Sequence, residues 1–371
     1  MSKHLYVHPF FFLLPLILWL TACGAPNPTE EAPATPLNTS PGQLPVQLIV
    51  YTPKNLIDEN LVQAFGEEAN ISIVQRNYAT DQELLSLLAQ PQERISLIVA
   101  SNYAASRLQE ETLLAPLTPA NLTNINNVEG RFRNPIYDPN NQYCVAYTYG
   151  TIGIGYINGQ GLPPTSWGDI FRQASDSPAY GRTTLLNHSR EALGAALIHL
   201  GYSPNTSNEN EINEAKNLII ESANAYASVD SLTYWENLAN FQTSLAQGFS
   251  RDFLAGQQIN AEMNYALPSE GTLLRIYNFC IPRSAPADHK LGAELFINTA
   301  LQPEWGASSV LSLELPTTLI MDEDLVALDT QLNPLIYPPT EVLNNAQYVY
   351  SLGAQEILYT TAWEDVLNAI R

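Results

Sequence analysis

The side chains best suited to catalysis lie together at the start of a predicted helix. His188, Ser189 and Glu191 are the residue types that hydrolases combine as base, nucleophile and acid. Neighbours at one helix start do not easily reach the geometry in which a base takes the proton of a nucleophile while an acid orients that base. The chain also has no Gly-x-Ser-x-Gly segment. We therefore expect that the protein is not an enzyme, with a hydrolase as the competing class.

No cofactor-binding pattern takes the place of such a catalytic site. The five histidines show no metal-ligand spacing. Residues 150–155 (GTIGIG) lack the glycine spacing of a dinucleotide-binding turn and are more typical of a bend, and no Gly-rich phosphate loop follows a predicted strand. We expect no metal ion and no cofactor.

A binding pocket is what residues 249–282 favour. Phe249, Arg251 and Asp252 are followed by the turn at 268–271 (PSEG) and by an apolar, aromatic run that predicts a buried strand up to Pro282. Gly271 permits the positive φ of a tight turn, so the segments on either side of the turn fold back on one another. Polar side chains beside a buried strand indicate a pocket.

The composition indicates which ligands such a pocket could take. The chain has 371 residues, of which 45% are hydrophobic and 14% charged, so it can bury two cores and most of it is not disordered. Its net charge of -21 repels phosphate backbones and excludes nucleic acid as a partner. A cationic ligand fits this charge better, although an acidic surface also serves solubility alone.

The first 45 residues predict export and attachment to a membrane. Residues 1–22 carry Lys3 and then the apolar run 9–20, as a signal peptide does. Residues 20–23 (LTAC) resemble a bacterial lipobox, which implies a lipid on Cys23; the alternative is an ordinary signal peptide with an unrelated cysteine. Residues 24–45 are rich in Pro, Thr and Ala and predict an extended linker. We expect a lipid-anchored protein in the periplasm or at the cell surface.

The remainder predicts two α/β lobes joined by a hinge. Strands and helices alternate over residues 46–100, which indicates a mostly parallel sheet, and again over 153–275. Residues 143–156 indicate one strand leaving the first lobe, a bend at the glycines and a second strand entering the other lobe. A return strand at 276–282 would lie beside them. Ligands bind beyond the carboxyl ends of parallel strands, so the loops at 52–55 and 101–103 are candidate binding loops.

Several segments together resemble the bacterial spermidine/putrescine-binding proteins, the solute-capturing components of polyamine ABC importers. They follow one another in the family's order from about residue 46 to the end of the chain. The matching segments are 98–103 (IVASNY), 134–141 (NPIYDPNN), 147–156 (YTYGTIGIGY), 166–169 (SWGD), 189–191 (SRE), 200–206 (LGYSPNT), 268–271 (PSEG), 280–282 (CIP) with 285–287 (APA), and 315–317 (LPT).

The resemblance implies an α/β, two-lobed periplasmic-binding-protein-like (type II) fold that closes on a polyamine and delivers it, as a monomer, to an ABC permease. We expect lobe 1 to comprise 46–152 with 276–320, and lobe 2 to comprise 153–275 with 321–371. Position matching gives the ligand Ser101 and Tyr103 from lobe 1, and Glu191, Phe249 and Asp252 from lobe 2. Carboxylates suit the ammonium ends of a polyamine, and rings suit its methylene groups.

The sequence departs from the family at several of these positions. Arg275 and Tyr277 replace a Trp-x-Asp pair, His188 stands where an acidic residue is common, Val349 stands where a glutamine can contact the ligand, and 53–55 (PKN) replace an aromatic and acidic loop. A guanidinium in the cleft repels a polyamine unless Glu191 or Asp252 neutralises it. An amino acid, an oligopeptide or an anionic solute is therefore the alternative ligand.

Each candidate binding residue also has a structural interpretation. Glu191 favours the macrodipole in the first turn of a helix. Asp252 fits a solvated surface, Arg275 fits a surface pair with Glu270, and the aromatic side chains fit a hydrophobic core. Cys144 and Cys280 lie in the two expected hinge strands, where they form either a disulfide or two buried thiols.

Overall fold

The computed structural model describes residues 44–370 except 92 and 322. The predicted signal peptide, Cys23 and nearly all of the predicted linker lie outside the described residues. The helices and strands of the first half are β1 (Gln47–Pro53), α1 (Glu59–Ala69), β2 (Ser72–Tyr78), α2 (Asp81–Ala89), β3 (Leu97–Ser101), α3 (Asn102–Glu110), β4 (Cys144–Ile157), α4 (Gly168–Phe171), β5 (Thr183–Leu185) and α5 (Ser189–His199).

The second half continues the alternation of helices and strands. Its elements are α6 (Glu209–Glu221), β6 (Tyr226–Val229), α7 (Tyr234–Ala239), β7 (Leu245–Phe249), α8 (Ser250–Gln257), β8 (Met263–Ala266), β9 (Leu273–Cys280), α9 (Ala287–Ala300), α10 (Pro303–Leu313), α11 (Leu328–Gln331), α12 (Thr340–Asn345), β10 (Gln347–Tyr348) and α13 (Glu356–Ile370). Among the described residues, no helix is both long and apolar enough to cross a membrane.

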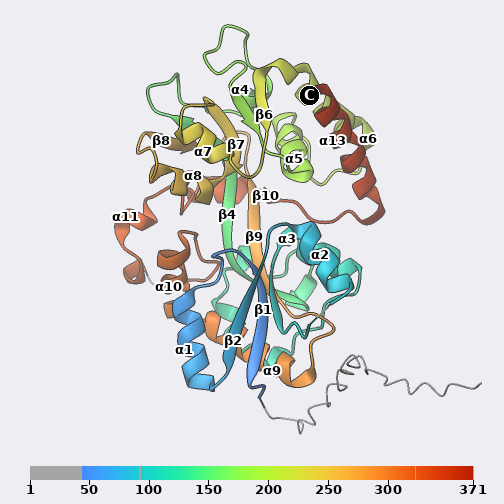
Figure 1. Ribbon diagram of the computed structural model, residues 1–371, viewed down its shortest axis with the longest axis vertical. Coiled ribbons are helices and arrows are strands. Elements are labelled where there is room, and N and C mark those ends of the chain that lie inside the picture. Colours follow the sequence, from blue (N-terminus) through green and yellow to red (C-terminus); the bar gives the residue numbers. More distant parts are fainter. Residues whose placement is uncertain (1–43, 92, 322, 371) are drawn as a thin grey trace, which may run out of the picture. The chain divides into compact units, whose positions relative to one another are not determined.

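One curled sheet runs through both lobes. Its strand order is β2-β1-β3-β9-β4-β7-β5-β6, with β10 beside β9 and β8 beside β4. β1 pairs in parallel with β2 and β3, and β5 pairs in parallel with β6 and β7. The two parallel groups are connected by the antiparallel pair of β4 and β9, which Figure 1 shows running from one group to the other.

β4 is a single strand, so the predicted bend at its glycines is wrong. Its pairing with β9 shifts register between Ala146 and Thr148, before the glycines. The glycines allow neighbouring segments to approach the β4 backbone closely. A Cβ on Gly155 would lie 2.1 Å from the Phe253 ring, and one on Gly153 would lie 2.5 Å from the Ala266 carbonyl oxygen. The strand stays extended because α8 and β8 pack directly on its backbone.

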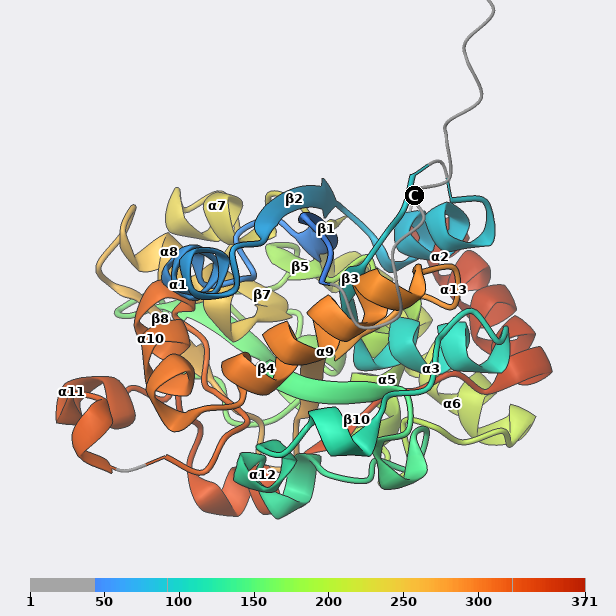
Figure 2. The same cartoon turned by 90° about the horizontal axis from the view of Figure 1, so that it is seen from below.

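Each parallel group has its own hydrophobic packing. In lobe 1, Ala293, Phe296 and Ile297 of α9 share one hydrophobic cluster with Leu48 and Val50 of β1. Figure 2 shows α9 from below. In lobe 2, α5, α6 and α13 share another cluster around the fully buried Trp167 and Tyr359 side chains. Both lobes therefore have cores of their own, joined through β4 and β9. The residues at which one lobe passes into the other stay a prediction.

Candidate functional site

A cavity of about 190 Å³ lies where the two lobes meet. Of the two predicted binding loops, 52–55 reaches it through Pro53, and 101–103 does not line it. Lobe 1 contributes the ends of β1 and β2 and the start of α2, and lobe 2 contributes the loop before α5 and the junction of β7 with α8. β4 and β9 form its floor. The lining residues are Pro53, Tyr78, Ala79, Asp81, Gly150, His188, Ser231, Phe249, Ser250, Arg251, Asp252, Arg275, Tyr277 and Leu315.

Arg275 connects the two lobes across this cavity. Its Nη2 donates to Asp81 Oδ2 and its Nη1 to Glu191 Oε1, both at 2.9 Å. Asp81 stands in the first turn of α2 and Glu191 in the first turn of α5, so each carboxylate also lies at the positive end of a helix dipole. Burial alone would lower the pKa of Arg275, but the neighbouring Asp81, Tyr277 and Glu191 raise it above its usual value. The guanidinium is therefore charged.

Asp252 is the acidic side chain that lobe 2 presents to the cavity. The Tyr234 hydroxyl donates to its Oδ2 and also accepts the backbone N–H of Phe249 at 3.0 Å. Tyr234 is fully buried, so one phenol fixes both the carboxylate and the aromatic residue beside it. Burial raises the pKa of Asp252, while the Tyr234 hydrogen bond and the nearby Arg251 and Arg275 hold it down.

Aromatic rings surround the charged groups. The Arg275 guanidinium carbon lies 5.5 Å from the Phe249 ring centre and 5.8 Å from that of Tyr277. His188 packs edge to face on Phe249, and its Nδ1 lies 3.8 Å from Glu191 Oε2. At the mouth of the cavity, the Arg251 Nη2 donates to the carbonyl oxygen of Asn55 in lobe 1 at 2.8 Å.

The structure brings most of the predicted binding residues to one place. Phe249, Asp252, Arg275 and Tyr277 line the cavity. Glu191 stands directly behind Arg275, and Ser101 stands behind Asp81, because its hydroxyl donates to Asp81 Oδ2 at 2.8 Å. Ser101 also caps α3 by accepting the N–H of Ala104.

Tyr103 is not brought to the cavity. Its hydroxyl donates to Glu356 Oε2 at 3.2 Å, and the ring faces the Arg190 guanidinium at 6.0 Å. The first turn of α3 points Ser101 toward Asp81 and turns Tyr103 toward α13, because residues two apart on a helix face different directions.

The predicted surface pair of Arg275 with Glu270 was wrong. The Glu270 Oε1 instead accepts from the Ser166 hydroxyl and lies 2.8 Å from His199 Nδ1. The N-cap of α5 is His188, without a side-chain capping bond. Asn187 is engaged elsewhere, since its Oδ1 accepts from the Trp363 indole N–H.

Asp81 is the main residue that sequence reasoning missed. It stands in the first turn of α2, where Thr80 is the N-cap and accepts the N–H of Glu83. A usable signal was present: Tyr78 ends the parallel strand β2, and Asp81 follows it at a carboxyl end where ligands bind. Tyr78, Ser231 and Ser250 were also missed.

A larger cavity of about 590 Å³ lies on lobe 2, around Tyr156, Leu162, Asp169 and Arg172. Residues of a single lobe line it, and Leu162 is almost fully exposed. We place the candidate site at the smaller cavity, because only that one brings buried charged side chains from both lobes together.

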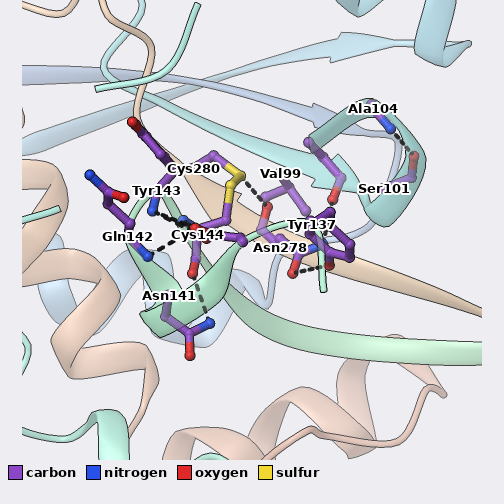
Figure 3. The surroundings of a disulfide bond; sticks show 12 residues. Val99, Ser101, Ala104, Tyr137, Asn141, Gln142, Tyr143, Cys144, Asn278 and Cys280 are labelled. Carbon is purple, nitrogen blue, oxygen red and sulfur yellow. Dashed lines mark hydrogen bonds between the residues drawn. A yellow bond between two sulfur atoms is a disulfide. The ribbon is translucent and has the colours of Figure 1, made fainter. Parts of the chain in front are cut away.

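Cys144 and Cys280 are joined by a disulfide in the structure. They are direct partners in the antiparallel pairing of β4 with β9, with 4.5 Å between their Cα atoms. Figure 3 shows the two side chains pointing toward one another. The buried Asp138 carboxylate accepts the N–H groups of residues 142–144 and so holds the start of β4 in place. The bridge therefore ties the lobe 1 ends of both hinge strands.

Comparison with protein families gives a match to the profile of bacterial extracellular solute-binding proteins over residues 60–310. The chain is 26% identical over 321 residues to the spermidine/putrescine-binding periplasmic protein of Escherichia coli, covering 84% of this chain and 89% of that protein. It is also 26% identical over 250 residues to the putrescine/cadaverine-binding protein of Pseudomonas aeruginosa, covering 64% and 70%.

Solved structures share the fold. The spermidine/putrescine ABC transporter substrate-binding protein PotD from Streptococcus pneumoniae superposes with a TM-score of 0.79 at 22% identity, over 88% of this chain and all of the other. The TpPotD lipoprotein of Treponema pallidum gives a TM-score of 0.77 at 24% identity, over 86% and 99% of the two chains. These neighbours confirm the two-lobed periplasmic-binding-protein fold.

Proposed function

Since the chain belongs to the family of bacterial extracellular solute-binding proteins, we propose that it captures an aliphatic amine of the polyamine class in the cavity between its lobes and delivers it to an ABC permease. The names of the relatives support this solute class, because spermidine, putrescine and cadaverine are all flexible aliphatic amines. Family membership also makes the protein extracytoplasmic and its role that of a carrier in transport.

The observation that carries the proposal is the meeting of acidic and aromatic side chains from opposite lobes. Asp81 comes from lobe 1 and Asp252 from lobe 2, and both line the same cavity with Phe249 and Tyr277. Carboxylates make charge-assisted hydrogen bonds to ammonium groups, and ring faces accept methylene groups and cations. Phe249, Asp252 and Tyr277 contact the amine directly, while Ser101, Glu191 and Arg275 order the wall behind them.

The mechanism needs no chemical step. A solute that touches lining residues of both lobes together stabilises the closed arrangement, whereas a solute that touches one lobe shifts nothing. β4 and β9 both run from one lobe to the other, so closure changes these strands. The disulfide fixes their lobe 1 ends and confines bending to the segment beyond it.

Two arginines in the cavity wall support a second candidate class of ligand. Arg251 and Arg275 both line the cavity, and a guanidinium is the group that best binds a carboxylate. An amino acid, an oligopeptide or another solute with an anionic group is therefore the alternative. The amine is favoured because Arg275 already has two carboxylate partners within the protein.

We also propose that Cys23 carries a lipid and that residues 24–45 tether the binding unit, as a monomer, to the membrane. The lipobox-like residues 20–23 support this. Phase separation of expressed protein in detergent tests the anchor: the natural chain should enter the detergent phase, and Cys23→Ser should stay in the aqueous phase. Equal partitioning of the natural chain and the Cys23→Ser variant would contradict the proposed lipid anchor.

The test of the solute class is a thermal-shift screen of the purified protein against polyamines, amino acids and oxyanions. A ligand at a hundred times its Kd stabilises the folded protein by about 2.7 kcal/mol, which gives a clear rise in Tm. We expect the rise with amines. Stabilisation by amino acids or oxyanions alone would replace the proposal by its alternative, and ester or peptide hydrolysis without any stabilising ligand would indicate an enzyme.

A further inference from the structure

The surroundings of Arg275 are those that a bound ammonium group requires. Two carboxylates, Asp81 and Glu191, each accept a hydrogen bond from it at 2.9 Å. Two ring faces, Phe249 and Tyr277, flank the guanidinium carbon within 6 Å. We call these four residues with Arg275 the Arg275 cluster. Its cation-binding position is filled by a side chain of the protein itself.

Arg275 is held there firmly. Its side chain is 12% exposed, and those of Asp81 and Glu191 are 15% and 8% exposed. The carboxylates come from different lobes and the guanidinium from hinge strand β9, so all three elements fix the group. A guanidinium does not give up its proton in proteins, so this positive charge is permanent.

The charges around the cavity leave little attraction for a second and third cation. Asp81, Glu191 and Asp252 are opposed by Arg275 and Arg251, which leaves one net negative charge. His188 faces Glu191 and adds positive charge when protonated. Tyr78 and Tyr277 are neutral, since burial raises the pKa of both phenols.

Asp252 is the carboxylate that remains for the ligand. Its Oδ2 accepts a hydrogen bond from the Tyr234 hydroxyl. Within the described residues, Asp252 forms no ion pair, and the ion pairs of Arg275 go to Asp81 and Glu191.

We infer that Arg275 is a built-in cation that replaces one ammonium group of the ligand, so that this cavity selects amines carrying a single positive charge over diamines and triamines. The inference rests on the proposed function, since it assumes that the ligand is an aliphatic amine. Arg275 is then the residue that determines specificity for ligand charge, and Asp252 receives the one ammonium group.

The test is isothermal titration calorimetry of the purified protein with three amines that share a four-carbon segment. N-acetylputrescine, putrescine and spermidine carry one, two and three positive charges. We expect affinity to fall by about tenfold or more from the first to the second, because each additional cation faces Arg275 at protein-like dielectric. Spermidine should bind most weakly.

Two variants assign this order to Arg275. Arg275→Gln removes the cation, so putrescine should overtake N-acetylputrescine, whereas Arg275→Lys keeps the charge and should keep the natural order. Arg107→Gln is the matched control: this arginine does not line the cavity and instead pairs with Glu111 at 2.7 Å at the end of α3, so its removal should not change the order.

Each result has a definite meaning. Tighter binding of putrescine or spermidine than of N-acetylputrescine by the natural protein overturns the inference and leaves the proposed function standing. Tighter binding of 4-aminobutyrate than of all three amines, or no binding of any amine, overturns the proposed function itself. Where Arg275→Gln fails to show a cooperative thermal transition, the ligand series on the natural protein and on Arg275→Lys still decides.

Discussion

Removing the Tyr234 hydroxyl should shift the pH at which the protein releases an amine. Tyr234→Phe keeps the buried ring, which packs edge to face on Phe253 at 5.7 Å between ring centres. It removes the hydrogen bond to Asp252 Oδ2 and leaves the N–H of Phe249 without its acceptor. The change therefore touches the acidic and the aromatic side of the cavity without opening a large void.

The magnitude follows from those two hydrogen bonds. A hydrogen bond to a charged group contributes about 1.5–3 kcal/mol, and a buried donor left unpaired costs about 1–3 kcal/mol, so we expect the free energy of unfolding to fall by about 3 kcal/mol. One pKa unit corresponds to about 1.36 kcal/mol. If the ionised form of Asp252 loses about 1.36 kcal/mol of stabilisation, the pKa of Asp252 rises by about one further unit.

The direction of the pH effect is fixed by which form of Asp252 binds. An ammonium group needs the ionised carboxylate, so affinity is present above the pKa of Asp252 and is lost as the pH falls through it. Burial already raises that pKa, and the Tyr234 hydrogen bond opposes the rise. In Tyr234→Phe, the loss of affinity should therefore begin about one pH unit higher than in the natural protein.

Calorimetric titration with N-acetylputrescine and putrescine across the acidic pH range measures this shift. Tyr265→Phe is the matched control, because Tyr265 belongs to the same hydrophobic cluster and its hydroxyl donates to Thr151 rather than to a carboxylate. The control should lose stability and keep the natural pH profile. Identical profiles for the Tyr234→Phe variant and the natural protein would refute the role of Asp252 as the ammonium partner.

Three further changes test the surrounding architecture. Gly248→Ala should lower Tm strongly in a thermal melt, because a Cβ there would lie 2.0 Å from the fully buried Tyr234 ring, and an unchanged Tm would contradict the packing. Phe249→Ala should weaken amine binding by about tenfold in calorimetry through the lost ring contacts, and an unaltered Kd would place the ligand elsewhere. The Cys144–Cys280 bridge spans a sequence separation of 136. Its reduction should lower the free energy of complete unfolding in urea by about 5 kcal/mol. Equal urea midpoints with and without reductant would show that folded lobe 2 already holds the strands together.

Much of the fold was predictable because local patterns agree with the final structure. The predicted alternation of strands and helices over residues 46–100 is observed as β1, α1, β2, α2 and β3, and β1 pairs in parallel with β2 and β3. The predicted pairing of 276–282 with 143–149 is observed as β9 with β4. The bend at the β4 glycines was wrong because a glycine pattern does not distinguish a turn from a backbone that neighbours approach closely.

The candidate site was predictable only in part. Phe249, Asp252, Arg275 and Tyr277 were named in advance and line one cavity. Asp81 was missed, because its position near a helix start has a complete local explanation and nothing in the sequence pairs it with a residue 194 positions away. Position matching placed Tyr103 beside the ligand. In the structure, its hydroxyl instead donates to Glu356, the first residue of α13.

The sequence by itself determined the class of the protein, since strand and helix periodicity, ordered motifs and an acidic composition are all properties of short segments or of the whole chain. Only the tertiary structure decided what Arg275 does. Its charge meets Asp81 and Glu191 because two helix starts from different lobes converge on one hinge strand. Whether a cation in a cleft repels a ligand or replaces part of it depends on such partners, and their distances are fixed only when the chain is folded.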